Sequence, residues 1–174
     1  NEAGKRPESV TLQVKANGVV VTEAEVNENN LWRYEFTVPK YDSLGNEIEY
    51  SIDEREIGNK FYQKIGVEEN VVINKFIVPD EKVQIKVQKS WDDNDDEAEK
   101  RPESIILQVK DGETVVAEAE VSEETNWEHT FELPKYDRLG DEINYTVDET
   151  FESKFYIKNI VGNVITNKFV VPED

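Results

Sequence analysis

The sequence predicts an all-β chain that folds as two tandem β-sandwich domains. Short stretches in which apolar and polar residues alternate recur along the chain, as they do in half-buried strands. Turn residues separate these stretches, and no segment shows the apolar periodicity of a convincing amphipathic helix. The same motifs also occur twice in the same order, which indicates two similar domains.

Three short motifs carry the internal repeat. They are KRPES at residues 5–9 and 100–104, PKYD at 39–42 and 134–137, and NKF at 74–76 and 167–169. A repeat of roughly 95 residues that holds several strands indicates tandem domains rather than the turns of a solenoid. We therefore expect one domain over residues 1–79 and a second over residues 80–174, joined by a short, semi-rigid linker that contains proline.

In the first copy, short strands follow one another between clear turn signals. Residues 10–14 alternate, and Asn17-Gly18 after them is a strong hairpin signal. Residues 24–26 alternate again, and residues 32–38 place aromatic and apolar side chains at every second position. Pro39 ends this aromatic row, because proline cannot continue a β ladder. Seven or so such strands in about 90 residues favour a sandwich.

The second copy repeats this order and adds a strand in front of it. Its hairpin signal is Asp111-Gly112, and its aromatic row covers residues 127–133, where His129 takes the place of Tyr34. The added strand covers residues 83–91. The first copy starts in the loop before Lys5, so we expect its domain to lack this strand. The closing segment matches the linker, so we expect another copy to follow.

Three polar residues of the second copy fall on core faces of their strands. Lys89 is in phase with the apolar residues of 83–91. Glu149 is in phase with the apolar residues that precede it in its own strand, and Asn167 is in phase with Ile165 and Phe169. An unpaired ammonium in a core costs several kcal/mol, so the lysine must be neutralised, paired or chemically consumed. An amine, a carboxylic acid and a carboxamide aimed at one core can react with one another.

The first copy keeps two of these three groups. Glu54 and Asn74 are in phase with the apolar residues of their strands, as Glu149 and Asn167 are. No lysine precedes them in the corresponding strand, and Lys5 and Lys15 lie in elements that cannot replace it.

Composition excludes several functional classes. Lys and Arg number 20 against 39 Asp and Glu, a net charge of −19, so nucleic acid and anionic membranes are poor partners. The chain has no cysteine, which excludes disulfides, zinc-thiolate sites and thiol nucleophiles. No signal peptide or apolar run long enough to cross a bilayer is present. We expect no cofactor and no metal.

Taken together, the motifs of the second copy resemble the Cna B-type domain, the stalk repeat of Gram-positive collagen adhesins and pilins. They are KSWDDNDD at 89–96, KRPES at 100–104, the Trp127 strand, LPKYD at 133–137, YTVDE at 145–149 and ITNK at 165–168. The resemblance covers all of the second copy and most of the first. It implies two tandem immunoglobulin-like β-sandwiches with an inverse strand arrangement, on the wall-attached surface of a Gram-positive bacterium, with neighbouring repeats as partners.

The family also forms a spontaneous isopeptide bond between a first-strand lysine and a last-strand asparagine or aspartate, assisted by a buried acid. By resemblance these residues are Lys89, Asn167 and Glu149. Glu54 and Asn74 are their equivalents in the first copy, where the lysine is absent. Such chemistry happens once per domain and is not enzymatic turnover. The alternative interpretation of the three residues is a buried ion pair or a partly exposed strand edge.

Two other functions stay open on the sequence. The first is an extracellular binding module for a host protein or calcium: Asp92, Asn94, Asp96 and Glu103 have calcium-loop spacing, but Glu97 stands where that loop needs glycine, which favours a solvated acidic loop. The second is an accessory domain of a carbohydrate-active enzyme. It predicts exposed aromatic rows, whereas Trp32 and Trp127 are in phase with the core.

Overall fold

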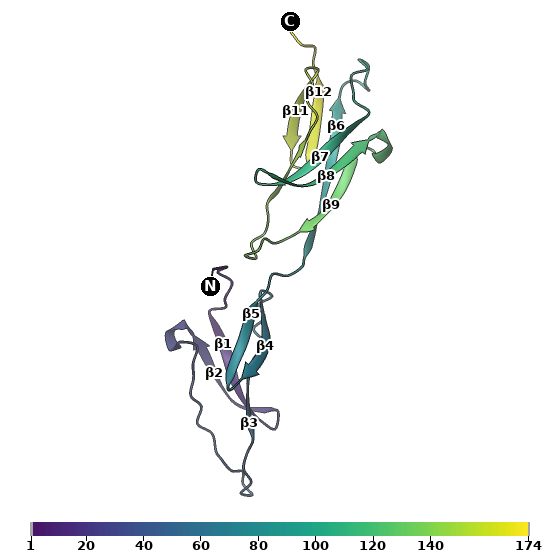
Figure 1. Cartoon of the computed structure of the whole chain (residues 1–174). Helices are drawn as coiled ribbons and strands as arrows, with labels where there is room; N and C mark the ends of the chain where they lie inside the picture. Colours follow the sequence, from purple (N-terminus) through teal and green to yellow (C-terminus); the bar gives the residue numbers. More distant parts are fainter. Residues whose placement is uncertain (1, 174) are drawn as a thin grey trace. The chain divides into compact units, whose positions relative to one another are not determined.

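The structure is a computed structural model that describes residues 2–173. The chain divides into two compact units, and the main division falls between Pro79 and Asp80. Both units are built from β-strands with a single short 3-10 helix each (Figure 1). In this described range, no helix is long and apolar enough to cross a membrane.

The first unit contains two small sheets. The three-stranded sheet has the order β2-β1-β3, and the two-stranded sheet pairs β4 with β5. All of these pairs are antiparallel. The elements are β1 (Ser9–Ala16), β2 (Val19–Asn27), η1 (Glu28–Asn30), β3 (Tyr50–Glu54), β4 (Tyr62–Glu68) and β5 (Val71–Phe76).

The second unit is a complete sandwich. One sheet has the order β10-β7-β8, and the other has the order β11-β12-β6-β9. The elements are β6 (Lys82–Asp92), β7 (Ser104–Asp111), β8 (Thr114–Ser122), η2 (Glu123–Thr125), β9 (Glu128–Pro134), β10 (Tyr145–Glu149), β11 (Tyr156–Val161) and β12 (Val164–Phe169). The predicted fold class, tandem all-β sandwiches, is confirmed.

The first and last strands of the second unit lie side by side. β6 pairs with β12 in parallel, in a register that sets Ile165 opposite Lys89, and it pairs with β9 in an antiparallel ladder on its other side. β6 therefore lies between β9 and β12 in the sheet: residues 82–88 pair with β9, and residues 88–92 pair with β12. This arrangement places side chains of the first strand next to those of the last.

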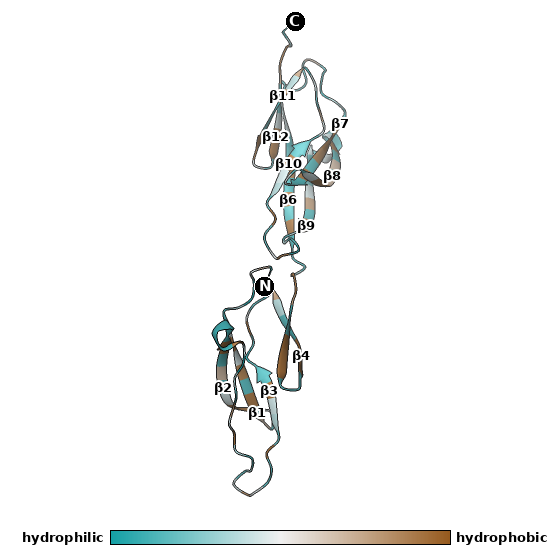
Figure 2. Ribbon diagram, turned by 60° about the vertical axis from the view of Figure 1, so that its left-hand side comes forward, coloured by the Kyte–Doolittle hydropathy of each residue, from teal (hydrophilic) through white to brown (hydrophobic). Residues whose placement is uncertain are grey.

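Alternating patterns in the sequence explain which faces are buried. Hydrophobic and hydrophilic residues alternate along β1 and β9 (Figure 2). In the second unit the inward faces of both sheets meet in one apolar cluster. Its buried members are Ile85, Val87, Ile105, Leu107, Val109, Val121, Phe131, Val147 and Ile165.

The hairpin predicted at Asn17-Gly18 is confirmed. Ala16 pairs with Val19, so the turn has two residues, and both take positive φ, 50° at Asn17 and 80° at Gly18. The turn of the second copy lies one residue later than predicted, because Asp111 still pairs with Thr114 and closes the ladder.

The aromatic row predicted as a strand of the first copy is not one. Residues 33–39 have no regular structure, whereas the equivalent residues of the second copy form β9. The physical reason is the partner strand: β9 pairs with β6 along its whole length, and the described part of the first unit contains no counterpart of β6. Without that ladder, alternation alone does not hold the row in a strand.

The missing strand also leaves the core of the first unit less covered. Leu107 on β7 is fully buried, while the equivalent Leu12 on β1 is only partly buried. Among the described residues of the first unit, the buried apolar side chains are those of Val14 and Val26.

This difference can be measured with a matched pair of substitutions. We expect Leu107→Ala to lower the free energy of unfolding of its unit by about 3 kcal/mol, because it leaves a cavity in a packed core. Leu12→Ala should cost about 1 kcal/mol, because less apolar area is removed from contact. Urea denaturation followed by tryptophan fluorescence measures both values, and equal costs would contradict the incomplete core.

Candidate functional site

The three polar residues predicted to face the core lie together inside the second unit. Lys89 comes from β6, Asn167 from β12 beside it, and Glu149 from β10 in the opposite sheet. Their exposed fractions are 2%, 1% and 4%. Strand alternation brings them together: Asn167 lies two residues beyond Ile165, the partner of Lys89, and so faces the same side of the sheet.

Glu149 lies between the other two groups. Its Oε2 is 3.4 Å from Lys89 Nζ, and the side chains of both residues are fully buried. Its Oε1 accepts a hydrogen bond of 2.7 Å from Asn167 Nδ2. Lys89 Nζ also donates to the carbonyl of Ser90 at 3.2 Å. One carboxyl group therefore contacts both the amine and the carboxamide.

Two oxygen atoms at the site accept no hydrogen bond from the described residues. They are Glu149 Oε2 and Asn167 Oδ1. An acid that activates the amide for attack by an amine has to bond to its carbonyl oxygen, whereas here the amide nitrogen faces the acid. A half-turn about the Asn167 Cβ–Cγ bond exchanges the two groups, and a protonated Glu149 then donates to Oδ1.

Burial favours the reactive form of the lysine. Removal from water lowers the pKa of Lys89 from 10.5 to about 8, and the nearby Glu149 carboxyl offsets part of this shift. The lysine nitrogen lies 4.1 Å from the centre of the Trp91 ring, a contact that attracts the charged form and so opposes the effect of burial. Near neutral pH a useful fraction of this amine is uncharged, and an uncharged amine is a nucleophile.

The first unit holds the corresponding acid and amide without an amine. Glu54 on β3 is 8% exposed and accepts a hydrogen bond of 2.9 Å from Asn74 Nδ2 on β5. The described residues of this unit include no strand at the position of β6. A groove of about 750 Å³ lies there instead, lined by both residues and by Trp32 and Tyr34. Lys15 on β1 pairs with Asp53.

The acidic loop with calcium-loop spacing bonds several of its polar groups to one another and to nearby backbone. Asp96 accepts hydrogen bonds of 2.9 Å from the backbone nitrogens of Lys100 and Arg101, and Asn94 donates to Glu97. Across residues 2–173, no group of three His, Cys, Asp or Glu side chains could hold a metal ion. His129 packs against Phe131, with ring centres 4.6 Å apart.

Sequence reasoning missed Asp93. The residue is 6% exposed, and its carboxylate accepts hydrogen bonds from Arg101 and from Tyr156. The signal was present, because Asp93 continues the alternation that links Lys89 to Trp91, two residues beyond the end of the predicted strand.

Comparison with known proteins gives consistent matches. The profile of the Cna protein B-type domain matches residues 1–75 and 85–168. A collagen adhesin of Staphylococcus aureus is 34% identical in an alignment 176 positions long, which covers 97% of this chain and 14% of that protein. The crystal structure of two B repeat units (B1B2) of the collagen binding protein of the same species is 32% identical, with a TM-score of 0.62 over 99% of this chain and 46% of that one.

The pKa of Lys89 predicts a pH dependence for a chain that cannot cross-link. A lysine with a lower pKa in the folded state binds fewer protons there than when unfolded, so stability rises with pH between the two values. In Asn167→Ala, we therefore expect the second unit to gain stability from about pH 8 to about pH 10.5.

The matched control is the double variant Asn167→Ala/Lys89→Met, which should lack this gain. Urea denaturation of both variants over this pH range gives the difference. If the free energy of unfolding changes with pH in the same way in both variants, the pKa of Lys89 is not lowered in the folded state.

Proposed function

The chain belongs to the Cna protein B-type domain family, and on that premise we propose that its two units are stalk repeats of a bacterial surface adhesin and that a Lys89–Asn167 isopeptide bond locks the second unit. The observation that carries the covalent part is the meeting of three buried groups from three strands: Glu149 lies 3.4 Å from the lysine nitrogen and 2.7 Å from the amide nitrogen.

The proposed reaction balances within these three side chains. The neutral Nζ of Lys89 attacks Cγ of Asn167 and forms the Nζ–Cγ bond, while protonated Glu149 polarises Oδ1. Glu149 then takes one proton from Nζ and gives one to Nδ2, so its own protonation is unchanged at the end. The Cγ–Nδ2 bond breaks and ammonia leaves. Folding supplies the proximity that makes this slow amide exchange feasible.

The reaction would remove from the core the lysine ammonium, whose burial is unfavourable. A buried ammonium paired with one carboxylate gains little net stability, because the cost of desolvating two ions offsets their attraction. An amide bond carries no charge and ties β6 to β12. If the chain-entropy treatment of disulfides applies, closing this loop adds about 4 kcal/mol of stability.

The first unit would form no such bond within this chain. Glu54 and Asn74 supply the acid and the acceptor, but the described residues include no strand at the position of β6 to carry the amine. Lys64, opposite Asn74 on β4, pairs with Asp53 instead. We infer that they are the acceptor half of an equivalent site, which a lysine-bearing strand would have to complete.

The stalk role extends to location and partners. The matched adhesin is far longer than this chain, which spans 14% of its length. We propose an extracellular, wall-attached position for the protein that contains these repeats, with neighbouring repeats as their contacts. The net charge of −19 disfavours nucleic acid and anionic membranes as partners.

Intact mass after denaturation tests the bond. We expect the chain to be about 17 Da lighter than its sequence, the loss of one ammonia. Peptide mapping should place the link between Lys89 and Asn167, and Glu149→Gln should restore the full mass because it removes the proton shuttle.

The control is Asn74→Ala, the same residue type at the equivalent position of the first unit, which should keep the deficit. A full mass in the unsubstituted chain would refute the covalent site and leave a buried ion pair. A doubled deficit would mean that the first unit also finds an amine.

A further inference from the structure

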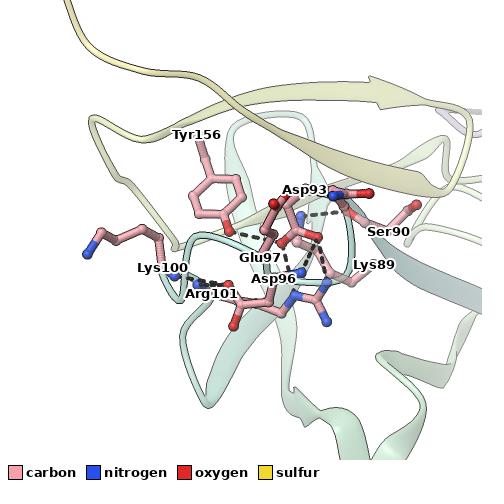
Figure 3. Close-up of polar contacts among 9 residues, drawn as sticks. Lys89, Ser90, Asp93, Asp96, Glu97, Lys100, Arg101 and Tyr156 are labelled. Atoms are coloured by element: carbon pink, nitrogen blue, oxygen red, sulfur yellow. Dashed lines mark hydrogen bonds and ion pairs between the residues drawn. The ribbon is translucent and has the colours of Figure 1, made fainter.

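A second buried polar cluster lies directly beside the proposed reaction site. Asp93 follows the end of β6, and its two carboxylate oxygens are bonded by groups from distant segments (Figure 3). Arg101 donates from Nη2 to Oδ1 at 2.6 Å and from Nε to Oδ2 at 3.0 Å. The Tyr156 hydroxyl, at the start of β11, donates to Oδ2 at 2.9 Å. We call these three residues the polar latch.

The charges of the latch are well defined. The hydrogen bonds from Arg101 hold the pKa of Asp93 below its usual value, so the carboxylate is ionised. Burial raises the pKa of Tyr156, so the phenol keeps the proton that it donates. Asp93 and Arg101 therefore neutralise each other, and the latch adds little net charge next to the core.

The latch contacts the ring that covers the reactive amine. The Trp91 ring centre is 4.1 Å from Lys89 Nζ, 5.5 Å from Arg101 Cζ and 5.2 Å from the ring centre of Tyr156. The indole nitrogen of Trp91 is buried and has no hydrogen-bond partner among residues 2–173. Packing alone therefore fixes this ring, against Arg101, Tyr156 and the rings of Trp127 and Phe151.

From these contacts we propose that Asp93, Arg101 and Tyr156 are positioning residues for isopeptide formation: they hold Trp91 over the Lys89 amine and keep water away from it. The inference rests on the proposed function and assigns a role to the KRPES motif, whose arginine is Arg101. The hydrogen bonds of the latch join the end of β6, the segment before β7 and the start of β11. We therefore expect the reaction site to be complete only when all three segments are in place.

Charge neutralisation is the second part of the role. An unpaired Asp93 carboxylate would favour the ammonium form of Lys89, which cannot attack. Arg101 opposes this effect by pairing with Asp93. The other charged groups that act on Lys89 are Glu149 on β10 and Lys158 on β11, and both stay unchanged when Arg101 is replaced. On β9, His129 lies opposite Val87, on the same face of the sheet as Lys89, and is also unchanged.

The repeat offers a matched control. Arg6 occupies the place of Arg101 in the first KRPES motif, with its Cζ 5.8 Å from the Trp32 ring centre. The described part of the first unit contains no counterpart of Asp93. Arg6→Gln therefore makes the same chemical change outside the proposed latch.

The experiment measures how fast the bond forms in the full chain. The chain is made by cell-free synthesis, captured in denaturant before it folds, and refolded by dilution at several pH values. Samples are quenched in acid at successive times for intact mass, and tryptophan fluorescence follows folding in parallel. We expect Arg101→Gln to slow the loss of ammonia about tenfold at neutral pH, with the pH of half-maximal rate moved upward.

Two further variants complete the test. Arg6→Gln should react at the unsubstituted rate. Tyr156→Phe keeps its ring on Trp91 and loses only the hydroxyl, so it should react more slowly without loss of folding. It keeps the test decisive if Arg101→Gln fails to fold.

The outcomes separate this inference from the function on which it rests. If the unsubstituted chain loses no ammonia, both fail. If it reacts and the folded latch variants match it in rate and pH profile, the positioning role alone is wrong. A slower rate that only tracks slower folding, with an unmoved pH profile, would also overturn it in favour of a structural role.

Discussion

The second unit depends on how its core accommodates a lysine. Lys89 is on the inward face of an interior strand, where water cannot solvate its charge, so the surrounding structure must supply a compensating partner. Glu149 reaches it from the opposite sheet, and Asn167 lies beside it on the last strand. The inverse strand order is what makes this possible, because pairing of β6 with β12 brings the two ends of the domain sequence to one place in the core.

Strand periodicity predicted much of this site because a β-strand has a simple rule: every second side chain faces the same way. That rule identified Lys89, Glu149 and Asn167, and it would have identified Asp93 had the strand been followed two residues further. It failed for residues 33–39, whose alternation matches that of β9. Strand formation there requires hydrogen bonds from a neighbouring strand, and the pattern of one segment carries no information about its neighbour. Hydrogen-bond orientation at Asn167 was equally beyond sequence reasoning.

The two units form an internal comparison. They share the acid–amide pair, with Glu54 and Asn74 at 2.9 Å in one and Glu149 and Asn167 at 2.7 Å in the other. The acid–amide contact therefore does not depend on the lysine strand, because β3 and β5 hold it in place without one. What the strand contributes is the amine, the pairing partner of the aromatic row and the cover over the core. The acid–amide pair can thus take its geometry without the strand that completes the sandwich.

The parallel ladder between β6 and β12 also determines how a pulled domain transmits tension. Lys89 lies near the downstream end of β6, and Asn167 is two residues from the end of β12 at Phe169. With the proposed bond in place, force that enters at Lys82 runs along one strand, crosses a single covalent link and leaves almost at once. The residues between the two cross-linked positions, which include the whole of β7 to β11, lie outside that route. The other strands would then carry no load. The end-to-end length of the domain under force would stay short and fixed, whether or not the rest of the sandwich stays folded.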